Sequence, residues 1–111
     1  MYELHEEKNV VDLQELSELL QQPQPLIVLF REEVMGIGYI LNLMIEDLLH
    51  HERVQYVKVN LSPKHLWRSP YQLTQLPTLM LFRQGKEVAR ITDIMPKYKL
   101  AAYFQQFLQQ I

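Results

Sequence analysis

Residues 26–49 constrain the fold of this chain more than any other part of its sequence. They open with an unbroken apolar run, residues 26–30, which is too short for a helix and rich in strand formers, so it predicts a strand buried on both faces. The charged residues 31–33 predict a turn. After Gly36, apolar residues recur at the i, i+3, i+4 spacing of a helix, and the predicted inward stripe is Ile37, Ile40, Leu41, Met44, Ile45 and Leu48. A buried strand, a short turn and a long apolar helix predict the centre of an α/β domain.

Periodicity and turn residues predict the elements around this centre. We expect an amphipathic helix at residues 10–22, which Asn9 or Asp12 could cap. A short irregular helix is expected at residues 65–73, and a last helix at residues 97–111, directly after Pro96. Further strands are expected at residues 2–5, 54–61, 78–82 and 87–92. Gly85 supplies a positive φ for the hairpin between the last two strands. The chain has 111 residues, enough for one domain and too few for two, so a single domain over 1–111 is predicted.

The composition limits the classes of partner. Eleven basic and thirteen acidic residues give a net charge of -2, which argues against nucleic acid or an anionic membrane as a main partner. No apolar run approaches the roughly 20 residues that a membrane span needs. The acidic N-terminus does not resemble a signal peptide, and the chain has no cysteine, so we expect a cytoplasmic protein.

The order of these elements resembles the thioredoxin family along about the whole chain. In that family a central strand ends in Phe, four residues follow, and a Cys-x-x-Cys motif opens the second helix; here the same count from Phe30 leads to Met35. The Leu76-Pro77-Thr78 sequence and the Gly85 hairpin also match the family. The resemblance implies an α/β thioredoxin-like fold, with a central mixed sheet of four to five strands flanked by helices in the order βαβαβαββα. It also implies a cis peptide bond before Pro77, facing the turn that begins the second helix.

The chain departs from the family where the family's chemistry lies. Met35 and Gly38 stand at the two cysteine positions, and Leu29 stands where the family has a buried acid. Val34 replaces the aromatic residue ahead of the motif, and Leu43 replaces the helix proline. Thiol–disulfide exchange needs a thiolate and a second sulfur. We therefore expect a protein that is not an enzyme, with no catalytic residue and no cofactor, although family-based classification would still label it a redox protein.

The same resemblance predicts a binding surface. In thioredoxins the first turn of the second helix, the cis-proline loop and a late bend form a groove that holds an extended peptide by backbone hydrogen bonds. The residues at these positions are Val34, Met35, Gly36, Ile37, Leu76, Pro77 and Ile94, with Met95 beside them. They are more apolar than a solvated surface, which favours a protein or peptide partner, unless neighbouring side chains bury them.

Other features leave alternatives open. Tyr39, Leu43 and Leu49 lie off the predicted stripe of the second helix, which would suit a homodimer interface. Trp67 fits either an interface anchor or a lid over the end of the sheet. His50 and His51 lack the spacing of a metal site, so no metal is expected. No set of residues supports a small-molecule site.

Overall fold

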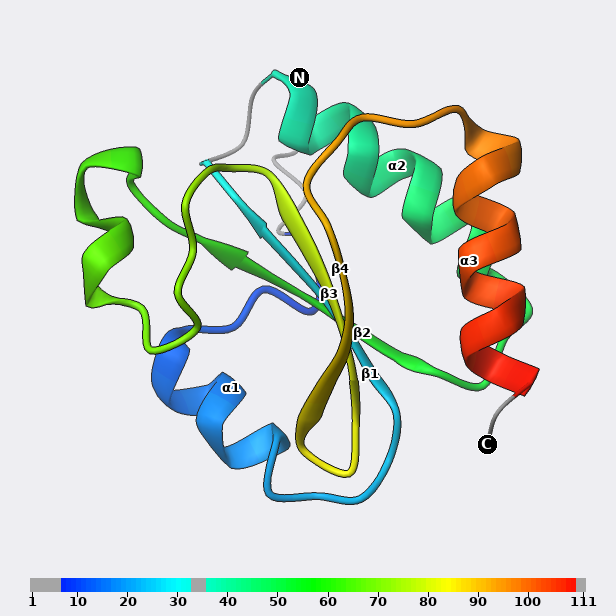
Figure 1. Cartoon of the computed structure of the whole chain (residues 1–111), viewed down its shortest axis with the longest axis horizontal. Coiled ribbons are helices and arrows are strands. Elements are labelled where there is room, and N and C mark those ends of the chain that lie inside the picture. The colour runs from blue at the N-terminus through cyan, green and yellow to red at the C-terminus, as the bar shows by residue number, and fades with distance from the viewer. Residues whose placement is uncertain (1–6, 33–35, 110–111) are drawn as a thin grey trace, which may run out of the picture.

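A mixed β-sheet lies at the centre of the molecule, with helices on both of its faces (Figure 1). The structure is a computed structural model, and it describes residues 7–32 and 36–109. Within these residues the sheet has four strands in the order β2-β1-β3-β4. β1 pairs in parallel with β2 and antiparallel with β3, and β3 pairs antiparallel with β4. The strands are β1 (Leu26–Arg31), β2 (Gln55–Asn60), β3 (Thr78–Arg83) and β4 (Lys86–Ile91).

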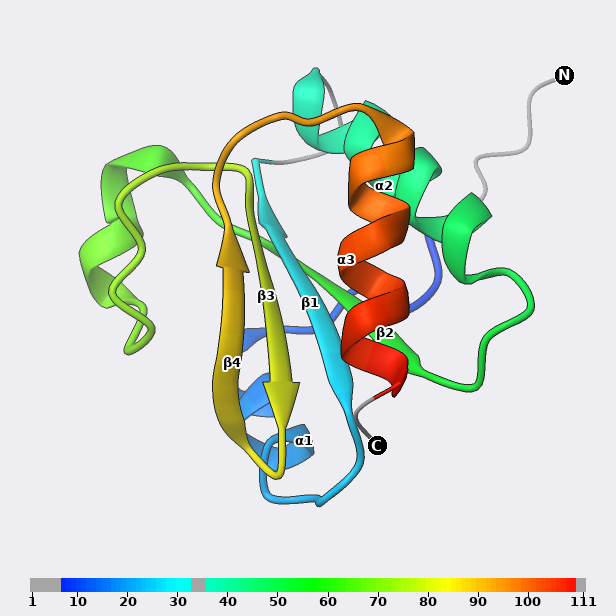
Figure 2. The same ribbon diagram turned by 45° about the vertical axis from the view of Figure 1, so that its right-hand side comes forward.

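The helices divide between the two faces of the sheet. They are α1 (Leu13–Leu19), α2 (Ile37–Leu49) and α3 (Lys97–Gln109), with a 3₁₀ helix, Pro63–Arg68, between β2 and β3. Figures 1 and 2 show α2 and α3 on one face, and α1 on the other. Each face has its own hydrophobic core. On one, Ile45 of α2 and Phe104 of α3 pack with Leu29, and on the other Leu16 of α1 packs with Val28 and Phe30.

Local sequence explains where several elements begin and turn. Asp12 is the N-cap of α1, and its side chain accepts a hydrogen bond from the Glu15 amide while the Glu15 carboxylate accepts one from the Asp12 amide. In the hairpin, Gln84 and Gly85 both have positive φ angles, 52° and 75°, as a two-residue turn between antiparallel strands requires. The predicted cap and the predicted role of Gly85 are thus confirmed, as is the mixed sheet flanked by helices.

The predicted inward stripe of α2 is right in its later turns and wrong at its start. Ile45 is buried, and Leu41, Met44 and Leu48 pack against the core. The residues that α2 buries most fully also include Gly38, Asn42 and Leu49, and Asn42 is only 1% exposed. Ile37 and Ile40, predicted to face inward, are 51% and 62% exposed. Periodicity pointed to the apolar residues because Gly38 and Asn42 carry no hydrophobic signal, yet one allows close approach to the sheet and the other forms buried hydrogen bonds.

Other predictions need correction at particular residues. Arg31 does not belong to a turn: it is the last residue of β1 and is fully buried. α1 begins at Leu13 rather than residue 10, because residues 9–11 run along the edge of β2, where the Val11 amide donates to the Lys58 carbonyl (2.9 Å). Trp67 is 75% exposed and is therefore no lid. The strand predicted at residues 2–5 lies outside the described residues.

Candidate functional site

Three segments meet at the end of the sheet where β1 ends and β3 begins. They are the start of α2, the loop before β3 and the loop after β4 (Figures 1 and 2). The Gln75 side-chain amide donates a hydrogen bond to the Thr92 carbonyl (2.8 Å), which ties the last two segments together. The Thr78 hydroxyl donates to the Gln75 carbonyl (2.8 Å) and fixes the loop around Pro77. The Leu76–Pro77 peptide bond is cis, as the family resemblance implies.

Gly36 begins α2 without a side-chain cap. Its φ angle is +85°, a conformation that favours glycine, and a Cβ at this position would have open space around it. The glycine is therefore explained by its backbone angle and not by crowding. Gly36 has no side chain, so the N-cap residue of α2 does not accept a hydrogen bond from the first amides of the helix.

The described part of the predicted groove is apolar and largely exposed. Ile37 and Ile94 are 51% and 64% exposed, and Ile40 lies on the same exposed side of α2. Leu76 and Pro77 are half-buried, with Leu76 packed against the core on the α1 side of the sheet. The structure thus brings Gly36, Ile37, Leu76, Pro77 and Ile94 to one end of the sheet. Val34 and Met35, the other two predicted groove residues, lie outside the described residues.

A buried cluster of polar side chains, which was not predicted from the sequence, lies beneath the first turns of α2. Alternation along the strands directs Arg31 of β1 and Lys58 of β2 toward α2, where both are at most 2% exposed. Glu7 meets them from the N-terminal segment, with one oxygen 2.9 Å from Arg31 Nη1 and the other in contact with Arg31 Nη2. Asn42 Nδ2 also donates to Glu7 (3.0 Å), and Lys58 Nζ bonds to Glu46 of α2 (2.9 Å).

The surroundings in this cluster change the pKa values of Glu7 and Tyr56. The hydrogen bonds from Arg31, together with the positive charges of Arg31 and Lys58, hold the pKa of Glu7 below its ordinary value, against the opposing effect of burial. Burial raises the pKa of Tyr56, whose hydroxyl donates to Asn42 Oδ1 (2.7 Å). Glu7 is therefore ionised and Tyr56 neutral at pH 7, as a network of charge-assisted hydrogen bonds requires.

Arg31 also explains the glycine at the position of the second family cysteine. A Cβ built on Gly38 would lie 2.8 Å from Cβ of Arg31, closer than side-chain carbons approach in folded proteins. The first turn of α2 can rest on the Arg31 side chain because residue 38 has no side chain. The buried Arg31 side chain thus leaves no room for a side chain at residue 38.

Comparison with known proteins gives the family. No family model matches the chain. The chain is 26% identical to a thioredoxin of Griffithsia pacifica over 102 residues, which cover 90% of this chain and 94% of that one. It is 30% identical to a thioredoxin of Rickettsia typhi over 81 residues, covering 71% of this chain and 77% of the relative. The chain belongs to the thioredoxin family. The solved structure of Chlamydomonas reinhardtii thioredoxin f2 superposes on it with a TM-score of 0.73 and 25% identity, over 87% of this chain and 93% of the other.

This thioredoxin-family chain keeps the scaffold of the site but no sulfur nucleophile. Its sequence contains no cysteine, and Gly38, which stands in place of one, is packed against Arg31. Among residues 7–32 and 36–109, no group of three or more His, Asp or Glu side chains is placed to hold a metal ion. In the same part of the chain no helix is both long and apolar enough to cross a bilayer. Among the described residues, this site offers a helix start without an N-cap side chain beside exposed apolar side chains.

Proposed function

We propose that this protein is a thioredoxin-family interaction module that binds a protein or peptide and performs no thiol–disulfide exchange. The binding surface is formed by Gly36, Ile37, Leu76, Pro77 and Ile94, and we place Val34 and Met35 beside them. We also place the protein in the cytoplasm, a compartment that suits a chain without disulfides.

The observation that carries this proposal is the exposure of isoleucines around Pro77. Ile37 and Ile94, each more than half exposed, come from segments that lie at the same end of the sheet, and Ile40 extends the surface by one turn of α2. A cluster of exposed branched aliphatic side chains beside a helix start without a capping side chain suits an extended peptide, which offers carbonyls to the helix amides and apolar side chains to the surface. The absence of cysteine removes the competing explanation that this end of the sheet serves a redox centre.

The Ile37→Asp substitution tests this surface. Aspartate at the first position of a helix interacts favourably with the helix dipole, so the variant is expected to fold with unchanged or slightly higher stability. In a pull-down from an extract of the source organism, the immobilised wild-type protein is expected to retain a partner and the immobilised variant is expected not to retain it. Once that partner is purified, its affinity for the variant is expected to be at least tenfold weaker than for the wild-type protein.

Val88→Asp is the matched control for that experiment. Val88 is similarly exposed, but it lies on β4 away from the start of α2. The proposal requires that Val88→Asp keeps the partner and that Ile94→Asp loses it together with Ile37→Asp. Equal loss in the Val88 variant, or full binding by both isoleucine variants, would show that the partner binds elsewhere.

Thiol chemistry has its own test. The protein is expected to reduce insulin disulfides no faster than the dithiothreitol control, because it has no thiolate to form a mixed disulfide. The precipitation of insulin, followed by turbidity, measures this directly, with a cysteine-containing thioredoxin as the positive control. A rate above the dithiothreitol background would contradict the proposal.

A homodimer through α2 is a second candidate, because Tyr39, Ile40 and Leu43 of this helix are all exposed. Light scattering after size-exclusion chromatography, over a range of protein concentrations, distinguishes the two. A homodimer predicts twice the monomer mass and a return to monomer in Leu43→Glu, whereas a module that binds only other proteins predicts a monomer at all concentrations. If a dimer forms through the outer face of α2 around Leu43, then Ile37→Asp is expected to leave the mass measured by light scattering at that of the dimer.

A further inference from the structure

Three donor side chains converge on the carboxylate of Glu7. Arg31 presents its two terminal nitrogens to the two oxygens, in the planar arrangement that suits a carboxylate. Asn42 Nδ2 donates to one of the same oxygens (3.0 Å), and Lys58 Nζ lies 3.8 Å from it. The donors come from β1, α2 and β2, so the fold as a whole positions them.

The three donors are held in place by contacts that do not involve Glu7. Arg31 Nε donates to Asn60 Oδ1 (2.9 Å), and Asn42 Oδ1 accepts from the Tyr56 hydroxyl (2.7 Å). Lys58 Nζ is bonded to Glu46 (2.9 Å). All three donors are at most 2% exposed, so the surrounding residues hold their side chains in a fixed geometry.

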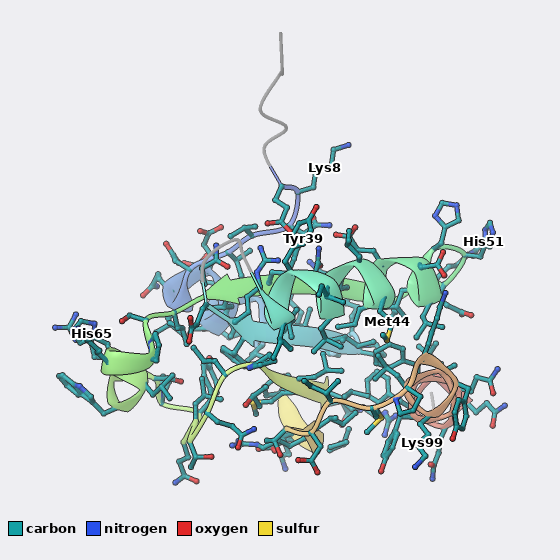
Figure 3. The ribbon with its side chains drawn as sticks, turned by 90° about the horizontal axis from the view of Figure 1, so that it is seen from above. Lys8, Tyr39, Met44, His51, His65 and Lys99 are labelled. Atoms are coloured by element: carbon teal, nitrogen blue, oxygen red, sulfur yellow. The ribbon has the colours of Figure 1, made fainter. Side chains whose placement is uncertain are left out.

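Glu7 itself is held much less firmly. It precedes every helix and strand of the described residues, and 29% of its side chain is exposed. The backbone of the segment that carries it pairs with the sheet at residues 9–11, which bond to the backbone of Lys58. In Figure 3 Lys8, the next residue along the chain, lies beside α2 and points outward from the protein. The carboxylate that fills the site is therefore in contact with solvent on one side.

We propose that Arg31, Asn42 and Lys58 form a carboxylate-binding site, which Glu7 fills in this chain and which accepts an acidic side chain of a partner when Glu7 leaves it. The site lies under the first turns of α2, and Glu7 occupies it reversibly. Arg31 without a carboxylate is a buried charge with too few acceptors, so the vacated site strongly favours a replacement anion. The ligand is expected to be an acidic side chain because the site is occupied by one.

Acetate is the probe that tests this site. Glu7→Ala removes the atoms beyond Cβ, which are those of an acetate ion, and leaves space of that shape beside Arg31. At pH 7 and equal ionic strength, replacement of chloride by about 0.2 M acetate is expected to raise the melting temperature of Glu7→Ala by about 3 °C or more, since a ligand that binds only the folded state stabilises it. The wild-type protein, whose site is filled, is expected to show no such difference.

Two further samples keep the test decisive. Glu7→Ala/Arg31→Lys keeps the positive charge but loses the planar pair of donors, so it is expected to gain nothing from acetate. If Glu7→Ala is unfolded in chloride, all samples are compared in sucrose, which favours the folded state of every variant. Equal responses to acetate in Glu7→Ala, the double variant and the wild type would overturn the proposal.

A peptide tests the nature of the ligand. A peptide with the sequence of residues 4–10 is expected to stabilise Glu7→Ala at a lower concentration than acetate does, and the same peptide with glutamine at position 7 is expected to have no effect. A glutamate peptide that acts no better than acetate would show that the site does not recognise an acidic side chain within a chain. Neither result depends on the surface around Pro77, so this proposal and the proposed function can fail separately.

Discussion

Glu7→Gln is expected to lower the free energy of unfolding by about 2–3 kcal/mol at pH 7, because it removes the negative charge that balances buried Arg31. Removing one partner of a fully buried pair usually costs somewhat more. The expected value is smaller here because 29% of the Glu7 side chain is exposed and because Lys58 keeps Glu46 as a partner. Urea denaturation followed by circular dichroism measures the change, with an unaltered dependence on urea as evidence that the fold is kept.

Glu87→Gln is the matched control. Glu87 pairs with Arg90 on the surface of β4, three residues apart, and such exposed pairs contribute at most about 1 kcal/mol. Glu87→Gln should therefore lower the free energy of unfolding by clearly less than Glu7→Gln does. Equal losses in the two variants would mean that Glu7 behaves as an ordinary surface residue.

The pH dependence of the same pair of proteins gives a second test. The folded state holds the pKa of Glu7 below its ordinary value of 4.5, so the unfolded chain binds more protons in that range and wild-type stability rises with pH. The stability difference between wild type and Glu7→Gln should be fully present above about pH 5 and should shrink as the pH falls below 4.5 and protonates Glu7. A difference that stays constant down to pH 3 would contradict the charge pairing.

Gly38→Cys is expected to lower the free energy of unfolding by about 2 kcal/mol, although it restores a residue typical of the family. The new Cβ would lie 2.8 Å from Cβ of Arg31, an atom close to the backbone that cannot move aside. Overpacking of this kind costs about 1–3 kcal/mol, which outweighs the gain of under 1 kcal/mol in helix propensity from replacing glycine. The double variant Met35→Cys/Gly38→Cys should therefore have a lower free energy of unfolding than the wild-type protein.

Ala102→Cys controls for the introduced thiol. Ala102 lies on the exposed side of α3, where a larger side chain meets solvent, so a change within about 0.5 kcal/mol is expected. Thermal or urea unfolding under reducing conditions compares the two variants. If Gly38→Cys is as stable as Ala102→Cys, then the close packing of Arg31 does not explain the glycine.

The sequence predicted the elements well because their signals are local. The apolar run of β1, Asp12 before α1 and Gly85 in the hairpin each lie within a few residues of the feature that they specify. The loop around Pro77 was predicted from its resemblance to a known family and not from periodicity. Its position next to the start of α2 follows from the topology of the sheet.

The errors at Arg31 and at the start of α2 have a common physical origin at the face between α2 and the sheet. Arg31 was predicted to lie in a turn because a charged residue is rarely buried without a partner, and its partner Glu7 is 24 residues away in sequence. Gly38 and Asn42 face the sheet for reasons that a hydrophobic pattern does not record, namely close approach and buried hydrogen bonds. The alternation of Tyr56, Lys58 and Asn60 on β2 was the one local signal of a polar strip facing α2.

The two proposed sites are adjacent and differ in chemistry. One is the apolar surface around Pro77, where Ile37 and Ile94 are exposed, and the other is the proposed carboxylate site under α2, which Glu7 occupies. Gly38 connects them physically, since the same turn of α2 rests on Arg31 and leads to the exposed helix start. A partner with apolar residues and a nearby acidic residue would fit both sites at once.

Amide hydrogen exchange on the protein with and without its captured partner tests the central claim most directly. The proposed binding surface predicts slower exchange in residues 36–38, 74–78 and 92–95 upon binding, and unchanged exchange in β4 around Val88. Protection confined to α3, to β4 or to the 3₁₀ helix, with no change in the segments around Pro77 and Ile94, would contradict it.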